Sequence, residues 1–233
     1  MANGKLELIH AGRNRTKARV WSWTSKGVAG GPSVSTRHWV LKEITACPVW
    51  MRVLFARRLL AREASAYREL SGVRGVPALR LTHGADLLAI DFIDGTPLHQ
   101  IDRSRLTEEI FDRLSGLLTA IHERGVVCGD LHHRNVIIGP SGEVHLVDFA
   151  LATIKGPAWR IFHRWLTRRL EELDNAALVR IRMKYMERPA TMDEAATLRR
   201  GARLWRFGRS LKRVLGLSGA GTGKTPARLG GGR

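Results

Sequence analysis

The hydrophobic pattern changes its period near residue 49, and this change limits the folds open to the chain. The first 45 residues carry short apolar runs of strand length, separated by Gly- and Ser-containing turns, which predicts a small antiparallel sheet. From Val49 the apolar positions recur every three or four residues, which predicts a helix. A sheet followed by helices predicts an α+β fold. The runs lie at 6–9, 19–23 and 38–42, and the apolar helix positions are Leu59, Leu60, Tyr67 and Leu70.

The sequence Asp-Gly-Thr-Pro at 94–97 follows an apolar run at 87–93 and predicts a hinge between two lobes. A helix is expected over 106–121, ended by Gly125, and a β-hairpin is expected after it. Everything after Ala150 is expected to form Arg-rich helices, one of them opened by a capping box at Thr191 and Glu194. The hairpin strands are expected at 136–138 and 144–147, and the units at 1–93, 94–216 and a disordered Gly-rich tail, 217–233.

Composition excludes several classes of protein. The chain has 233 residues, 44% of them hydrophobic, and only 2 Cys, which is incompatible with a disulfide framework. It has no apolar run of membrane-spanning length and no secretory signal, so we expect a soluble, cytoplasmic protein. The net charge is +18, and residues 151–233 contribute 19 basic against 6 acidic residues. An anionic partner would therefore meet mainly the last third of the chain.

The segment Cys-Gly-Asp-Leu-His-His-Arg-Asn at 128–135 carries the clearest chemical signal. Asp130 is followed five residues later by Asn135, and Asp148 follows the predicted hairpin. This layout orients an acceptor hydroxyl and holds Mg²⁺ on phosphates. It resembles the catalytic core of the protein-kinase-like superfamily, in which the loop is HxDxxxxN and the metal motif is DFG.

The same resemblance requires a strand Lys on the phosphates and a helix Glu that holds it. Lys42 ends the run Trp-Val-Leu-Lys at 39–42, and Glu63 lies in the middle of the apolar helix face. A buried face tolerates a carboxylate poorly unless the carboxylate is paired. Glu69 is the rival partner, but it lies off that face and is expected to be solvated.

The resemblance covers about residues 5–150 and implies a two-lobed fold, with a small antiparallel sheet and one helix in the first lobe and a mainly helical, truncated second lobe. It implies an ATP-dependent kinase in which Asp130, Asn135, Lys42 and Glu63 are catalytic and Asn135 and Asp148 bind Mg²⁺. His132 stands where Ser/Thr kinases carry a Lys. The nucleotide-binding residues it implies are Lys42, Gly12, Asp91, Ile93 and His132.

Departures from the protein-kinase pattern point to a branch with a non-peptide substrate. The loop begins Cys-Gly-Asp, Ala150 replaces the Gly of DFG, and no APE motif follows. The glycine-rich loop is reduced to Gly12 with four basic residues up to Arg19. The loop is more similar to those of aminoglycoside and choline phosphotransferases, RIO-like kinases and lipopolysaccharide (Kdo/WaaP) kinases, so a glycolipid sugar is the expected hydroxyl acceptor.

Residues 198–215 hold seven Arg or Lys and no acidic residue, in the pattern of a basic amphipathic helix. Such a helix suits an anionic membrane, and would hold the protein peripherally at the inner face of the cytoplasmic membrane. It equally suits RNA, as in a RIO-like protein kinase or ATPase, or simple solvation on the protein surface. The oligomeric state is left open by the sequence.

Blander interpretations stay open. Asp130, Asn135 and Asp148 can be ordinary loop residues, and a kinase fold can be an inactive binding module. A zinc site is a weaker alternative, because the available His and Cys residues match no ligand spacing. The Gly-Thr-Gly-Lys-Thr sequence at 221–225 imitates a phosphate-binding loop, but no strand precedes it. The His and Cys residues are His122, Cys128, His132 and His133.

Overall fold

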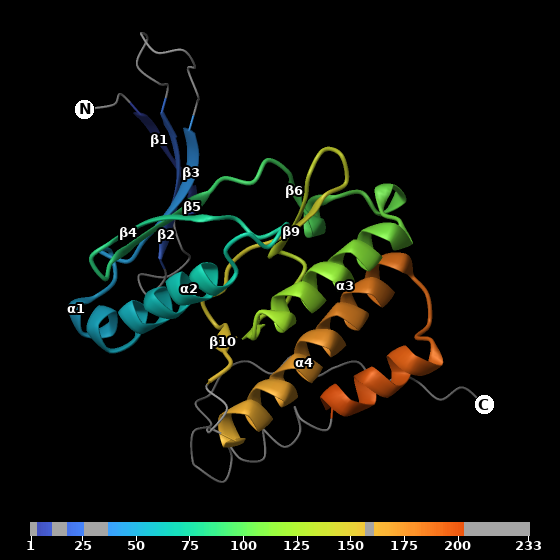
Figure 1. Cartoon of the computed structure of the whole chain (residues 1–233). Coiled ribbons are helices and arrows are strands. Elements are labelled where there is room, and N and C mark those ends of the chain that lie inside the picture. The colour runs from blue at the N-terminus through green and yellow to red at the C-terminus, as the bar shows by residue number, and fades with distance from the viewer. Residues whose placement is uncertain (1–3, 11–17, 26–36, 157–160, 203–233) are drawn as a thin grey trace.

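The computed structural model describes residues 4–10, 18–25, 37–156 and 161–202 (Figure 1). Within them the chain has an α+β architecture, with an antiparallel sheet and one helix at one end and a mainly helical part at the other. The expected tail at 217–233 lies outside the described residues, as does most of the basic segment 198–215. Of that segment only 198–202 is described, and these residues belong to a helix that is described over 192–202.

Five strands form the larger sheet, and every neighbouring pair in it is antiparallel. The three strands expected from the first 45 residues are present, and β3 occupies the centre of the sheet. In sheet order the strands are β1 (Gly4–His10), β2 (Arg19–Ser25), β3 (Arg37–Glu43), β5 (Leu87–Asp91) and β4 (Leu79–His83). The run expected at 87–93 therefore forms a strand that ends two residues earlier.

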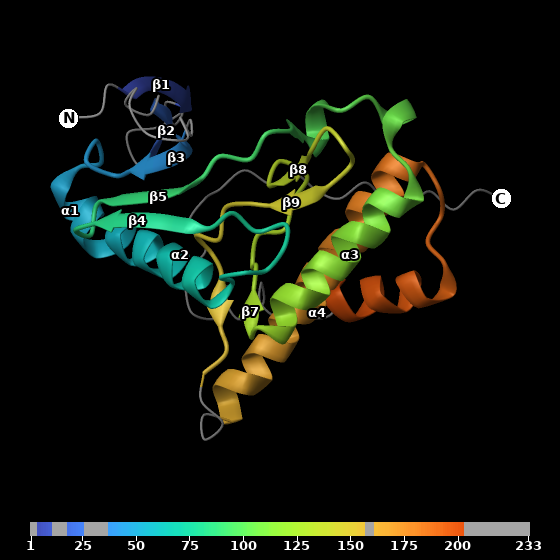
Figure 2. The same ribbon diagram turned by 45° about the horizontal axis from the view of Figure 1, so that its top comes forward.

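One helical run packs across this sheet, as Figure 2 shows. It consists of α1 (Val49–Met51), a π-helical turn η1 (Arg52–Ala56) and α2 (Arg57–Glu69). The helix expected over 49–70 is thus present but interrupted by the wider turn. Its core side is made by alanine, leucine and tyrosine residues that include Ala56, Leu60, Ala64 and Tyr67.

The second part begins with the short strand β6 (Thr96–Pro97) and two 3₁₀ turns, η2 (Leu98–Gln100) and η3 (Arg103–Arg105). Helices α3 (Glu108–Glu123) and α4 (Ile161–Met186) lie side by side in both ribbon views (Figures 1 and 2). The apolar face of α3 buries Phe111, Leu114, Leu118 and Ile121. Gly125 follows the helix with φ of 74°, a conformation that favours glycine and ends the helix.

In the sequence, four short strands lie between α3 and α4 among the described residues. The expected hairpin is formed by β8 (Val136–Ile138) and β9 (Val144–Leu146), and β6 pairs with β8. The expectation that only helices follow Ala150 was wrong, because β10 (Thr153–Ile154) pairs with β7 (Val126–Val127). Two residues are too few for a periodic pattern, so this pairing has no sequence signal.

Local sequence signals account for the start of the helix over 192–202. The Thr191 backbone N–H donates to Glu194 at 2.9 Å, and the Glu194 N–H donates to Thr191 Oγ1 at 3.3 Å. This is the capping box expected from the sequence.

No helix among the described residues has the length and apolar character needed to cross a bilayer.

Candidate active site

Lys42 occupies the central strand β3, opposite Val20 of β2 and Leu88 of β5. Its ammonium group lies 2.8 Å from Glu63 Oε2 and 2.9 Å from Asp148 Oδ1. A strand, a helix and the segment after β9 therefore meet at one positive charge. In sequence the two carboxylates lie 21 and 106 residues from Lys42.

Glu63 lies in the middle of α2 and is 2% exposed, whereas Glu69 is exposed. The structure therefore pairs Lys42 with Glu63, on the buried side of α2, and leaves the carboxylate of Glu69 in solvent. Burial raises the pKa of Glu63, and the neighbouring ammonium opposes this. Burial alone would lower the pKa of Lys42, but the charges of Glu63 and Asp148 outweigh it and raise the pKa. Lys42 is therefore held in its charged form.

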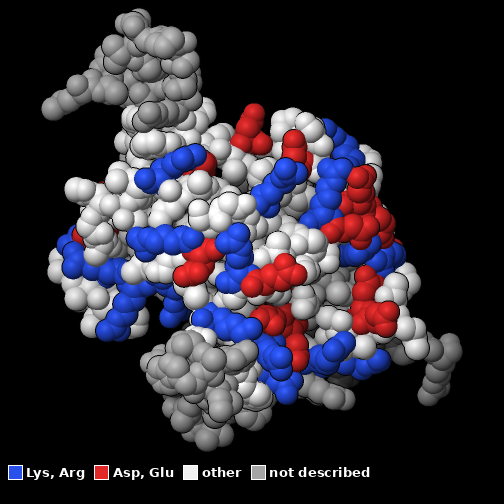
Figure 3. Space-filling model, in the orientation of Figure 1, with Lys and Arg blue, Asp and Glu red and all other residues white. Residues whose placement is uncertain are grey.

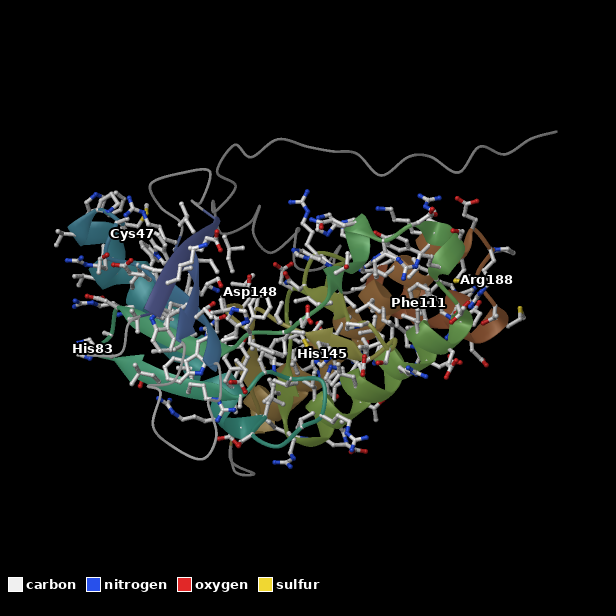
Figure 4. The ribbon with its side chains drawn as sticks, turned by 90° about the horizontal axis from the view of Figure 1, so that it is seen from above. Cys47, His83, Phe111, His145, Asp148 and Arg188 are labelled. Carbon is white, nitrogen blue, oxygen red and sulfur yellow. The ribbon has the colours of Figure 1, made fainter. Side chains whose placement is uncertain are left out.

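Asp148 has φ of 68°, a left-handed conformation that is uncommon for a residue other than glycine. Its backbone N–H donates to the Tyr67 hydroxyl at 3.2 Å, and the neighbouring Phe149 ring packs edge-on against Tyr67 at 5.2 Å. Helix α2 thus fixes the backbone that presents Asp148. Burial raises the pKa of the Asp148 carboxyl, but Lys42 more than compensates and lowers it, so the group is a carboxylate at neutral pH. In Figure 4 Asp148 lies between Cys47 on the sheet side and Phe111 on the helical side.

The loop at 128–135 is held by its own Asn135, which is 8% exposed. Asn135 Nδ2 donates to the Asp130 carbonyl at 3.2 Å, and the Asn135 N–H donates to the His132 carbonyl at 2.9 Å. The Asn135 carbonyl accepts from the Val147 N–H at 3.0 Å, which ties the loop to the residue before Asp148. The Asp130 side chain is half-exposed. It is therefore open to a molecule outside the chain.

His132 Nε2 lies 3.8 Å from Asp130 Oδ2, so the two side chains occupy the same side of the loop. The other ring nitrogen, Nδ1, is buried without a hydrogen-bond partner among the described residues. His133 points elsewhere, because its Nδ1 lies 2.6 Å from the Tyr185 hydroxyl. Burial, followed by the charge of Lys184, lowers the pKa of His133.

Asp174, on α4, was not identified from the sequence, yet it is 2% exposed and holds the start of the loop. Its carboxylate accepts from the N–H groups of Cys128 at 2.8 Å and Gly129 at 3.1 Å. His122 Nε2 lies 3.1 Å from the same carboxylate. In the sequence Asp174 follows Glu171 and Glu172 and is indistinguishable from a solvated helix residue.

A cavity of about 430 Å³ adjoins the cluster. Ligand sites commonly have this size. Its polar end contains Lys42, Glu63 and Asp148, and its remaining wall is apolar. The apolar wall is formed by Ala18, Val20, Ile44, Met51, Phe55, Ala56, Leu59, Leu60 and Ala150.

Three residues expected to bind nucleotide, Asp91, Ile93 and His132, do not line this cavity. The Asp91 carboxylate accepts two hydrogen bonds from Arg80, at 2.5 and 2.7 Å. The Asp91 N–H donates to the Ala78 carbonyl. Ile93 is half-buried two residues beyond the end of β5. Gly12, the remaining glycine expected at the nucleotide, lies outside the described residues.

The available oxygens suit Mg²⁺ better than a transition metal. Among the described residues no three or more His, Cys, Asp or Glu side chains form a metal-binding group. Mg²⁺ needs few protein ligands, because it binds one or two carboxylates together with substrate phosphates. The Asp148 carboxylate and the amide oxygen of Asn135 would meet that need. The alternative zinc set is dispersed, since His122 pairs with Asp174 and His133 with Tyr185.

No known family model matches the chain. A segment of 71 residues is 28% identical to an uncharacterized protein of Dictyostelium discoideum. The similarity covers 30% of this chain and 8% of the Dictyostelium protein.

Proposed function

We propose that the protein is an ATP-dependent phosphotransferase with a two-lobed, protein-kinase-like fold. Residues 1–93 would form the sheet lobe and residues 94–216 the helical lobe. The observation that carries the proposal is the contact of Lys42 with both Glu63 and Asp148, at 2.8 and 2.9 Å. The two carboxylates hold the Lys42 ammonium at the edge of the cavity, where it can bind a phosphate without a change of position.

The proposed roles follow from burial. Glu63 is buried and positions Lys42, which would bind the phosphates of ATP. Asp130 is half-exposed and would orient the acceptor hydroxyl and accept its proton. Asn135 and Asp148 would hold Mg²⁺, which when bound supplies positive charge next to the phosphates. Because such catalysis consists largely of positioning and charge stabilisation, each polar group should matter for rate more than for folding.

A non-peptide acceptor is favoured by the short connection after Asp148. Helix α4 begins at Ile161, and the described part of the connection already pairs as β10 with β7. This leaves little chain for the long segment that shapes a peptide groove. Among non-peptide acceptors we propose a glycolipid sugar, because the loop at 128–135 is similar to that of lipopolysaccharide kinases.

The test measures Mg²⁺-dependent ATP binding and transfer of the γ-phosphoryl group separately. Wild-type protein is incubated with labelled ATP and bacterial lipid, RNA and protein fractions. Asp130→Asn should abolish transfer and keep binding, whereas Asp148→Asn should weaken both. Asp193→Asn, an exposed aspartate in the helix over 192–202, is the matched control and should behave as wild type.

Label in the glycolipid fraction would support the proposed acceptor, and label in protein would favour a RIO-like kinase instead. Binding of ATP without Asp130-dependent label in any fraction would replace the enzyme with an inactive binding module. Absence of both binding and transfer would overturn the proposal.

A further inference from the structure

The start of the helical run exposes an unusual amount of apolar surface. Val49, Trp50, Val53, Leu54 and Phe55 are each between 49% and 65% exposed. Together with Leu59, at 37%, they form what we call the apolar face. A contiguous apolar patch on a protein surface marks an interaction site more often than an isolated exposed residue does.

The π-helical turn explains why these residues point outward. In α2 the buried positions Leu60, Ala64 and Tyr67 continue the inward stripe back to Ala56. The wider turn at Arg52–Ala56 accommodates an extra residue, so the residues within it and before it are out of register with that stripe. Residues whose sequence spacing suggests a core helix therefore face solvent.

The charged residues that the helical run itself places beside the apolar face are all Arg. Residues 49–62 include four Arg and no acidic residue. Arg58 and Arg62 are exposed, and Arg57 is paired with Asp86 at 2.7 Å. Figure 3 shows Lys and Arg side chains gathered at this end of the molecule, over the elements labelled α1 and α2 in Figure 1.

We propose that the apolar face docks on a bilayer containing anionic phospholipid. Exposed Trp, Phe and Leu side chains beside Arg residues are the composition of helices that lie in a membrane interface. Anionic headgroups complement Arg58 and Arg62, whereas a second copy of the chain packed symmetrically on this face would bring like charges together. The net charge of +18 adds a long-range attraction between the whole protein and the anionic bilayer.

Docking in this way brings the cavity close to the lipid. Phe55 and Leu59 belong both to the apolar face and to the wall of the cavity that contains Lys42 and Asp148. The bilayer would therefore lie next to the cavity opening. The docking itself does not depend on catalysis, so it can hold or fail separately from the proposed kinase activity.

A local probe tests the contact directly. Val53→Cys in the full chain is labelled with an environment-sensitive fluorophore, which is selective because Cys47 and Cys128 are each 4% exposed. Vesicles of phosphatidylcholine with phosphatidylglycerol should shift the emission to shorter wavelength. Vesicles of phosphatidylcholine alone should have a much smaller effect. The control is Met192→Cys, labelled at a position that is 87% exposed and far along the chain from the apolar face, which should not respond.

Sedimentation with the same vesicles measures affinity. Trp50→Gln with Leu54→Gln leaves the charge unchanged and should weaken binding about tenfold for each large side chain withdrawn from the lipid. Met192→Gln should bind as wild type. Unchanged binding of the double variant would mean that another segment contacts lipid, and would overturn the proposal. So would an unresponsive Val53 probe, or a dimer in solution that the same two substitutions dissociate.

Discussion

The carboxylate of Asp174 lies 2.8 Å from the backbone nitrogen of Cys128, across 46 residues of sequence. Its other oxygen accepts from the Gly129 N–H at 3.1 Å. Two backbone donors at the start of the loop are therefore satisfied by one buried helix residue. The position of Asp130, one residue further on, depends on this anchor.

We expect Asp174→Ala to lower the free energy of unfolding by about 1–3 kcal/mol, because it leaves the buried Cys128 N–H without an acceptor and removes the acceptor of the Gly129 N–H. Urea denaturation measures the change. Asn175→Ala removes an exposed neighbour on the same helix and should cost far less. If both variants unfold at the same urea concentration, the carboxylate does not support the loop.

Gly129 should tolerate no larger residue. It has φ of 74°, and an added Cβ would lie 2.5 Å from the Leu151 carbonyl oxygen. Gly129→Ala should therefore cost at least about 1–2 kcal/mol from the backbone conformation alone. Gly116→Ala is the control, since Gly116 is in α3 with nothing within 4 Å, and should stabilise the protein by about 0.5–1 kcal/mol. Equal melting temperatures for the two variants would refute this account.

Much of the framework could be predicted because it rests on local patterns. Strands β1 to β3, helix α3 and the hairpin of β8 and β9 follow from apolar period and turn residues. Glu63 could be picked out because a carboxylate in an apolar stripe requires a partner.

The remaining features depend on tertiary contacts that leave no local mark. Asp174 follows two other acidic residues, and only the packing of α4 against β7 buries it. Leu59 was predicted as a core position but is 37% exposed, because it lies at the wall of the cavity instead of against the sheet. Asp91 was expected at a nucleotide, but its pairing with Arg80 depends on the register of β4 and β5.

The pair of Lys42 and Glu63 should show strong coupling. Lys42→Met leaves a buried carboxylate uncompensated and should cost about 3–5 kcal/mol at neutral pH. Adding Glu63→Gln removes that charge and should restore most of the loss, which a double-mutant cycle in urea measures. Additive effects of the two substitutions would contradict the coupling.

The cost of Lys42→Met should also depend on pH. Burial raises the folded-state pKa of Glu63 above its unfolded value, so its stabilising contribution is present below the unfolded pKa and is lost as pH rises. The free energy of unfolding of Lys42→Met should therefore lie below that of the double variant by a smaller amount at pH 5 than at pH 8. The comparison variant, Arg57→Met, breaks a more exposed pair with Asp86 and should lower the free energy of unfolding by much less than Lys42→Met does.

Glu194 should govern part of the acid sensitivity of the fold. Arg188 donates to both of its oxygens, at 2.8 and 2.9 Å, and the Thr191 N–H donates to one of them. The hydrogen bonds from Arg188, against the opposing effect of burial, lower the pKa of Glu194 from 4.5 to about 2. Because the folded-state pKa is depressed, the contribution is complete above pH 4.5 and is lost as pH falls from 4.5 towards 2.

Glu194→Gln should therefore be less stable than wild type at pH 6, and the difference should narrow steadily below pH 4.5. Urea midpoints measured between pH 6 and pH 2.5 follow this difference. Glu69→Gln, which removes an exposed carboxylate that makes no ion pair with the described residues, is the control. Thr191→Ala, which removes only the hydroxyl of the capping box, should cost about 1 kcal/mol at every pH in the range. If the Glu194→Gln difference were also independent of pH, the carboxylate would act only as a cap, and its pairing with Arg188 would contribute nothing to folding.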